Sequence, residues 1–199
     1  MSVDGRLARG EETRRVTLQR AVELASVEGL EGITIGRLAS ELELSKSGIF
    51  ALFGSKEDLQ LAAVEHAEKI FRAHVVTPAA TADPGLPRLV ALLEHWLVYS
   101  KSRVFPGGCF FAAVAAEFDA RRGRVHDAIR SGQQQWGRFL ERLVTEAVEA
   151  GHLPADTDAA QLAFELFALA RAANTDAVLS GSDVPYERAT TAIGNRLRG

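Results

Sequence analysis

The stretch Leu30–Leu59, LEGITIGRLASELELSKSGIFALFGSKEDL, predicts two short helices joined by a tight turn, followed by the start of a third helix. Thr34 and Ser45 are suited to cap the two short helices, because a hydroxyl at this position accepts hydrogen bonds from the free amides of the first turn. Gly54 suits the reversal that follows, since glycine adopts left-handed torsion angles without steric cost. Ser55, with an acidic residue three positions later, is typical of the start of a further helix.

Apolar residues recur at helical spacing in both short helices and predict one buried face on each. These residues are Leu38, Ala39 and Leu42 in the first helix, and Ile49, Leu52 and Phe53 in the second. Two short helices with a brief turn are the form of a helix-turn-helix unit, whose second helix enters the DNA major groove while the first crosses the backbone. The geometry alone is not specific, because many helical proteins contain short paired helices.

The residue string is more specific than the geometry. LSKSGIFALFGSKEDL, residues 44–59, resembles the recognition helix and following turn of the tetracycline-repressor (TetR) family of bacterial transcriptional regulators, and ITIGRLASELELS, residues 33–45, resembles that family's first helix-turn-helix helix. The resemblance implies an all-α protein with a three-helix DNA-binding domain over residues 1–55. Residues 56–199 would form a helical domain that binds a small-molecule effector and dimerises.

The expected DNA contacts lie on the second short helix, at helix N-termini and near the start of the first long helix. Lysine and serine reach base edges, a small residue allows close approach, and helix N-termini attract phosphates. For the two arginines near the chain start, the alternative is solvated surface charge. The predicted contacts are Arg14, Arg15, Thr34, Ser45, Lys46, Ser47, Gly48, Phe50, Ala51, Ser55 and Lys56.

Two residues of the second short helix depart from the family pattern. Phe50 stands where the family usually has tyrosine, so one phosphate hydrogen bond worth roughly 0.5–1.5 kcal/mol is lost, although the ring can contact a thymine methyl group. Leu52 stands where histidine or tyrosine is frequent, which favours core packing over a further phosphate contact. Both departures affect the expected affinity and sequence preference.

Composition narrows the class of protein. The net charge is −3, and residues 1–60 carry eight Lys/Arg against ten Asp/Glu, which counts against DNA binding unless the cations are favourably placed. The single cysteine, Cys109, excludes an intrachain disulfide and a cysteine-cluster zinc site. The charged N-terminus is not a signal peptide, and the longest apolar run, residues 109–116, is too short to span a bilayer. These features predict a cytoplasmic protein.

The remaining pattern predicts further helices. Residues 1–10 are expected to be disordered or to form a flexible arm that places Arg6 and Arg9 near DNA phosphates, and a first long helix is expected from Glu11 to Glu28. Arg121, Arg122 and Arg124 are expected in a solvated loop or as a cap on helix carbonyls. The other expected segments are a helix over 55–76, a loop over 77–87, and helices over 86–103, 124–150, from a cap at 156 or 157 onward, and 186–197.

Aromatic side chains crowd the middle of the chain and predict either an ordinary core or an effector pocket between helices. No basic residue lies within 109–118, so we expect a largely apolar effector. The candidate pocket residues are His95, Trp96, Tyr99, Phe105, Phe110, Phe111, Val114, Phe118 and Trp136.

A seam of small residues near the C-terminus recurs at heptad-like spacing and predicts a homodimeric four-helix bundle, with an intrachain bundle as the alternative. The candidate interface residues are Leu143, Ala147, Ala159, Ala163, Leu166, Ala170, Ala173 and Ala177.

The sequence contains no motif for catalysis, metal or cofactor binding. The five histidines are scattered, and phosphate-cradling glycine loops and a nucleophile-elbow serine are missing. We therefore expect a ligand-responsive regulator, most often a repressor in this family, that binds a pseudo-palindromic operator as a homodimer. The alternatives are a helical small-molecule-binding protein that no longer binds DNA specifically and, without a catalytic constellation to support it, a small all-α enzyme.

Overall fold

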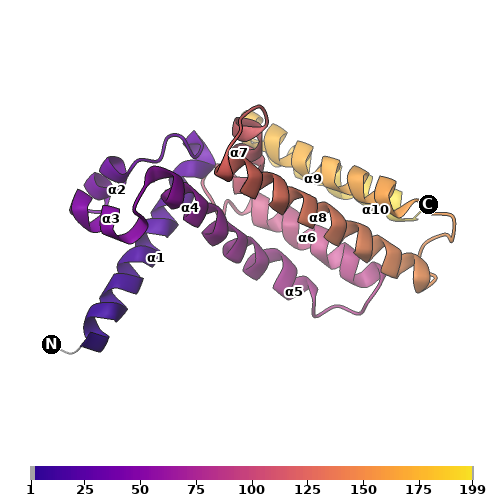
Figure 1. Cartoon of the computed structure of the whole chain (residues 1–199). Helices are drawn as coiled ribbons and strands as arrows, with labels where there is room; N and C mark the ends of the chain where they lie inside the picture. The colour runs from indigo at the N-terminus through magenta and orange to yellow at the C-terminus, as the bar shows by residue number, and fades with distance from the viewer. Residues whose placement is uncertain (1–2, 199) are drawn as a thin grey trace. The chain divides into compact units, whose positions relative to one another are not determined.

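The computed structural model of the chain describes residues 3–198, with side chains from residue 8 onward, and in that range every regular element is a helix (Figure 1). The prediction of an all-α fold is confirmed. No helix within the described residues is long and apolar enough to cross a membrane. The elements are α1 (Val3–Glu28), α2 (Ile35–Glu41), α3 (Lys46–Phe53), α4 (Lys56–Phe71), a π-helical turn η1 (Arg72–Val76), α5 (Thr77–Ala79), α6 (Leu86–Lys101), α7 (Phe110–Phe118), α8 (Arg124–Glu149), α9 (Ala159–Ser180) and α10 (Val184–Arg198).

The chain forms two compact units that each draw on two stretches of sequence. The first unit contains Met1–Lys69 and Phe105–Ile129, and the second contains Ile70–Val104 and Arg130–Gly199. The packing division therefore differs from the boundary expected at residue 55, because the first unit also includes most of α4 and the whole of α7. The reason lies in contacts between distant segments, since α7 packs against α1.

The helix ends of the first unit follow the predicted caps. The hydroxyl of Thr34 accepts from the Arg37 amide at 3.1 Å, and the hydroxyl of Ser45 accepts from the Gly48 amide at 3.0 Å. Gly54, which ends α3, has a φ of +79°. The predicted caps and the predicted reversal at this glycine are confirmed.

The N-terminus departs from the prediction of disorder. Val3–Gly10 form the first part of α1, while residues 1–2 and the side chain of Arg6 lie outside the described part of the chain. Extending a helix that is already packed costs much less than starting one, so a segment with weak preferences of its own joins it.

The helix after the DNA-reading segment also runs further than predicted. Beyond α4 the chain continues through η1 and α5 to Ala79, so the expected loop begins only at Ala80. Pro78 lacks an amide and would clash with the carbonyl four residues earlier in a regular helix. A π-helical turn just before it, in which the Thr77 amide donates to the Arg72 carbonyl, accommodates the proline while the chain stays helical.

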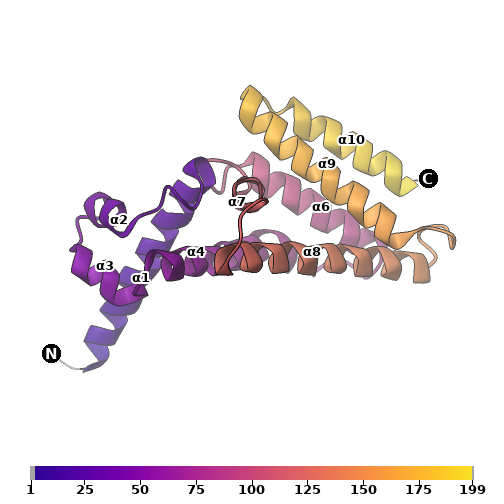
Figure 2. The same cartoon turned by 45° about the horizontal axis from the view of Figure 1, so that its top comes forward.

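The second unit is a bundle in which α9 packs against both α6 and α10. Helices α9 and α10 run side by side, as Figure 2 shows. The inner face of α6 is buried at Leu89, Leu93 and Trp96. The cap of α9 is Asp158 rather than the expected residue 156 or 157, because residues 154–157 form a turn and the Asp158 carboxylate accepts from the Gln161 amide at 3.0 Å.

The predicted dimer seam is wrong, because it packs within a single chain. Of the eight candidate interface residues, only Ala159 is partly exposed, and the buried ones are Leu143, Ala147, Ala163, Leu166, Ala170, Ala173 and Ala177. A heptad-like pattern identifies a face that packs against another helix, but it does not say which chain supplies that helix. The exposed apolar side chains of α9 are different ones, with Phe164 66% and Leu179 87% exposed.

Candidate nucleic-acid interface

Helices α2 and α3 form a compact pair that packs against α1. Leu38 of α2 and Ile49 and Phe53 of α3 are buried in this contact, as their spacing predicts, while Leu42 and Leu52 are half-buried. The turn between the helices passes through Glu43, whose φ of +54° lies in the left-handed region. The packing fixes which side of α3 faces outward.

The outer side of α3 carries the residues predicted to read DNA. Lys46, Ser47, Gly48, Phe50 and Ala51 are all exposed, and the Phe50 ring is 57% exposed. A large apolar ring left in solvent beside polar neighbours fits contact with a base edge, where thymine presents a methyl group.

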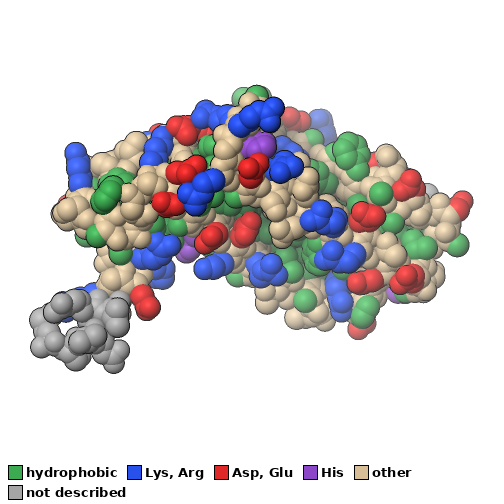
Figure 3. Space-filling view, viewed as in Figure 1, with side chains coloured by type: hydrophobic (Ala, Val, Ile, Leu, Met, Phe, Trp, Pro, Cys, Tyr) green, Lys and Arg blue, Asp and Glu red, His purple; other side chains and the backbone are tan. Residues whose placement is uncertain are grey.

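Lys46 differs from the other cations of this region because it has no ion pair or hydrogen bond with any described residue. Arg20 pairs with Glu41 at 2.6 Å, and Arg37 pairs with Glu28 and Glu41. Hydrogen bonds to Glu28, which has the larger effect, and to Glu41 raise the pKa of the Arg37 guanidinium further above its usual value. Acidic residues around α2 are thus paired with Arg20 and Arg37, and the positive charge of Lys46 on α3 stays available to DNA. Figure 3 shows positive and negative side chains interspersed over the visible surface.

The two arginines of α1 have different surroundings. The Arg14 guanidinium donates to the Leu52 carbonyl at 3.2 Å and stacks over the Phe53 ring at 4.6 Å, so it holds the last turn of α3. Arg15 is exposed and forms a two-point pair with Glu12 at 2.6 and 2.8 Å. The role of Arg14 in positioning α3 was not visible in the sequence, because its partners lie almost forty positions away.

The N-terminus of α4 combines a cap with an ion pair. The Ser55 hydroxyl accepts from the Asp58 amide at 3.0 Å and donates to the Asp58 carboxylate at 2.7 Å. Lys56 donates to the Glu31 carbonyl at 3.0 Å and pairs with the Glu31 carboxylate at 2.8 Å. This hydrogen bond from Lys56 is the largest cause of the lowered pKa of Glu31. A DNA phosphate would therefore compete with Glu31 for Lys56.

Within the first unit, α7 and the loop before it contact the end of α1 and the residues that follow it. The Glu117 carboxylate accepts from the amides of Leu30 at 2.6 Å and Glu31 at 2.9 Å. The Gly107 amide donates to the Ser26 hydroxyl at 3.0 Å, and a methyl group at position 107 would lie 1.8 Å from the Ser26 carbonyl oxygen. These residues carry no sequence signal, since each contact joins segments more than eighty residues apart.

The aromatic residues predicted to form one effector pocket belong to both units. In the second unit, edge-to-face contacts join Phe71 to Trp96, Tyr99 and Trp136, with ring centroids 5.0–6.1 Å apart. The predicted set omitted Phe71, and the half-buried His95 belongs to this unit too. The buried Nε1 of Trp136 has no hydrogen-bond partner among the described residues.

The other candidate pocket residues lie in the first unit. Ring contacts join Phe110 to Phe105 at 6.0 Å and to Phe111 at 5.2 Å. Val114 and Phe118 of α7 are buried. Across the described residues, no group of histidine, cysteine or acidic side chains could hold a metal ion.

Two family models match the sequence. Residues 18–63 match the model "Bacterial regulatory proteins, tetR family", and residues 85–193 match the model "Tetracyclin repressor-like, C-terminal domain". No functionally curated protein matches the chain.

Many solved structures share the fold. A TetR transcriptional regulator from Chloroflexus aurantiacus is 26% identical, with a TM-score of 0.88 and 96% of each chain covered. A putative transcriptional regulator from Saccharomonospora viridis in complex with choline is 24% identical, with a TM-score of 0.75 and 94% of this chain and 96% of that chain covered. AibR in complex with isovaleryl coenzyme A and operator DNA is 19% identical, with a TM-score of 0.68 and coverage of 81% and 85%.

Proposed function

Because the chain belongs to the TetR family of transcriptional regulators, we propose that it represses transcription by binding a pseudo-palindromic operator as a homodimer, and that a small molecule changes its DNA affinity. Members of this family are transcription factors rather than enzymes, in agreement with the sequence prediction. The observation that carries the proposal is the outer side of α3, where Lys46 has no partner among the residues that the structure describes and Phe50 is exposed.

The mechanism at the DNA follows from two-fold symmetry. A dimer presents two copies of α3 to successive major grooves, with half-sites about one helical turn apart. Lys46 and Ser47 supply donors for base edges, and the capped N-termini of α2 and α4 supply backbone amides for phosphates.

The dimer contact that we propose is the exposed side of α9. Phe164, Ala168, Ala172 and Leu179 follow one another at spacings of four, four and seven residues over about four helical turns, and all four are exposed in the single chain. An apolar stripe of this length on one helix requires a partner, and a second copy of the same stripe satisfies two-fold symmetry.

The effector site that we propose is the aromatic cluster of the second unit, around Phe71, Trp96, Tyr99 and Trp136. The buried Nε1 of Trp136, which has no partner within the described part of the chain, would donate to a hydrogen-bond acceptor on an otherwise apolar molecule. Two proteins of this fold were solved in complex with choline and with isovaleryl coenzyme A, which supports a small-molecule site in this chain. The effector shifts the DNA-binding equilibrium only as far as its affinities for the two states differ.

The test is selection of fragmented genomic DNA by the protein, followed by a salt titration on the selected fragments. The proposal expects a short inverted repeat, with affinity that falls steeply as salt increases. The alternative is a small-molecule-binding protein without specific DNA affinity, which the pairing of Lys56 with Glu31 favours. Recovery of nothing above background at low salt would support that alternative.

A further inference from the structure

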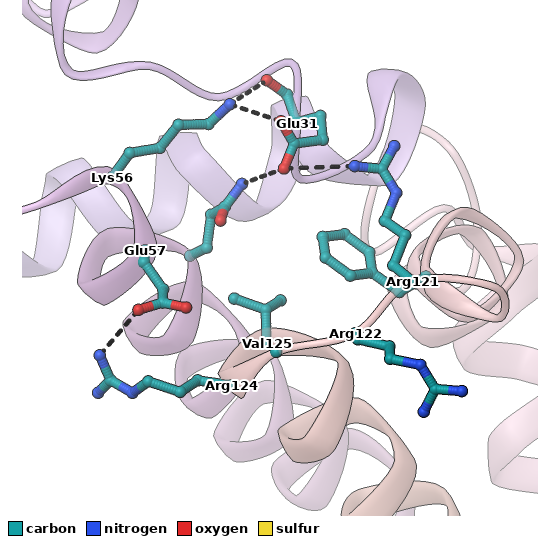
Figure 4. A pocket seen from close by; sticks show the side chains of 10 residues that line it. Glu31, Lys56, Glu57, Arg121, Arg122, Arg124 and Val125 are labelled. Carbon is teal, nitrogen blue, oxygen red and sulfur yellow. Dashed lines mark hydrogen bonds and ion pairs between the residues drawn. The ribbon is translucent and has the colours of Figure 1, made fainter.

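A cleft of about 300 Å³ lies within the first unit, between the N-terminal turn of α4 and the connection from α7 to α8 (Figure 4). Two carboxylates and four cationic side chains line it, which gives the lining a net positive charge. They are Glu31, Glu57, Lys56, Arg121, Arg122 and Arg124. The cleft contains none of the residues that we assign to DNA bases or to the aromatic cluster, although it shares Lys56 with the proposed contacts to DNA phosphates.

Most of these charges are already paired. Lys56 pairs with Glu31 at 2.8 Å, and Arg124 pairs with Glu57 at 3.0 Å. Arg121 caps the Glu117 carbonyl at 2.9 Å, as predicted for this basic cluster, and lies 3.5 Å from the Glu31 carboxylate. Arg122 is exposed and makes no ion pair or hydrogen bond with any described residue, and in Figure 4 its side chain extends away from the paired groups. Among the described residues of the cleft lining, Arg122 is therefore the cation that can pair with a bound anion.

Gln60 points to a ligand with a hydrogen-bond donor. Its side chain is part of the cleft wall, yet the residue is only 4% exposed. Its Nε2 donates to the Leu30 carbonyl at 2.9 Å and to the Glu31 carboxylate at 3.3 Å. Its Oε1 has no partner among the described residues. These two bonds fix the orientation of the amide, so the acceptor oxygen is left for a donor that enters the cleft.

The start of α8 favours an anion at the same place. Gly123, which precedes this helix of 26 residues, has no side chain that could accept hydrogen bonds from the first amides. Gly123 and Arg124 both line the cleft, so the positive end of the helix dipole is directed at it.

We propose that this cleft binds a small phosphorylated molecule that also carries hydroxyl groups, such as a sugar phosphate. The phosphate contacts Arg122 and the amides at the start of α8, and a hydroxyl donates to Gln60 Oε1. Lys56 and Arg124 already pair with Glu31 and Glu57. A ligand with a dianionic phosphate competes for these cations better than a ligand with a carboxylate. The volume lies at the lower end for ligand sites, which limits the ligand to a small molecule.

The test is calorimetric titration of the full chain, without DNA, with ribose 5-phosphate, ribose and inorganic phosphate. We expect ribose 5-phosphate to bind more tightly than either of the other two. Arg122→Ala removes a charge-assisted contact and should weaken this binding about tenfold or more, whereas Arg188→Ala, at an exposed arginine of the second unit, should leave it unchanged. Gln60→Leu should reduce the preference over inorganic phosphate, with its fold checked by thermal unfolding.

Because DNA is absent, the result does not depend on the proposed regulator function. No binding of ribose 5-phosphate would overturn the proposal, and so would equal affinity for inorganic phosphate, since Gln60 would then have no part in recognition. If Arg122→Ala instead weakened operator binding and flattened its salt dependence while no sugar phosphate bound, the anion would be a DNA phosphate and the proposal would fail.

Discussion

The outer side of α3 and the contact between α1 and α7 belong to the same unit and are built in opposite ways. On α3 the side chains are exposed, and Lys46 has no partner within the described chain. In the contact between α1 and α7, Glu117 accepts from the Leu30 amide and the Gly107 amide donates to Ser26. A methyl group at position 107 would have no space. A surface meant for another molecule leaves donors available, whereas a contact that holds the fold satisfies its polar groups. Substitutions in the first region should change DNA affinity, and those in the second should change stability.

The largest effect is expected at Gly107. In Gly107→Ala the new methyl group meets a backbone carbonyl that cannot move without shifting α1, so we expect a loss of about 3 kcal/mol in the free energy of unfolding. Denaturant unfolding measures it. Gly137→Ala is the matched control, because position 137 has open space on α8 and should gain about 0.5–1 kcal/mol. Equal stability of the two variants would contradict the close approach.

The next largest effect is expected at Glu117. Glu117→Ala leaves the Leu30 and Glu31 amides without their acceptor, and we expect a loss of about 2 kcal/mol in the free energy of unfolding. Glu117→Gln keeps one acceptor oxygen and should lose about half as much. A loss in the glutamine variant as large as in the alanine variant would show that charge, rather than acceptance from the amides, is what matters.

A smaller effect, on DNA affinity instead of stability, is expected at Lys46. Lys46→Ala should weaken operator binding about tenfold and reduce the salt slope by about 1 if the lysine contacts a phosphate, while the unfolding curve stays unchanged. Fluorescence anisotropy at several salt concentrations measures both quantities, with Arg188→Ala as the control. An unchanged affinity would remove Lys46 from the interface.

The smallest effect is expected at Lys56, because this lysine is already paired. Lys56→Ala should weaken binding to all sequences by less than about fivefold, since a phosphate gains only what remains after competition with Glu31. Glu31→Gln should then strengthen DNA binding slightly by releasing the lysine. If Lys56→Ala changed neither affinity nor salt slope, the phosphate contact assigned to it would be wrong.

The same contrast explains which features were predictable. Thr34, Ser45 and Gly54 act on their own neighbours, so their caps and turn could be identified from the order of residues. Arg14 and Glu117 act on partners distant in sequence, and no local pattern marks them. Most of the candidate pocket residues are aromatic and lie close together in sequence, yet Trp96 and Phe110 belong to different units.

The sequence by itself determined the helices, their caps and the DNA-reading unit, because these depend on hydrogen bonds and apolar spacing within a few residues. Only the tertiary structure decided that the alanine face of α9 packs inside the chain, that Phe164 and Leu179 remain outside, and that α7 belongs with α1. The physical reason is that the hydrophobic effect is non-directional, so the residues of an apolar face do not specify which surface will cover it. Which surface covers it is set by the simultaneous packing of all the helices.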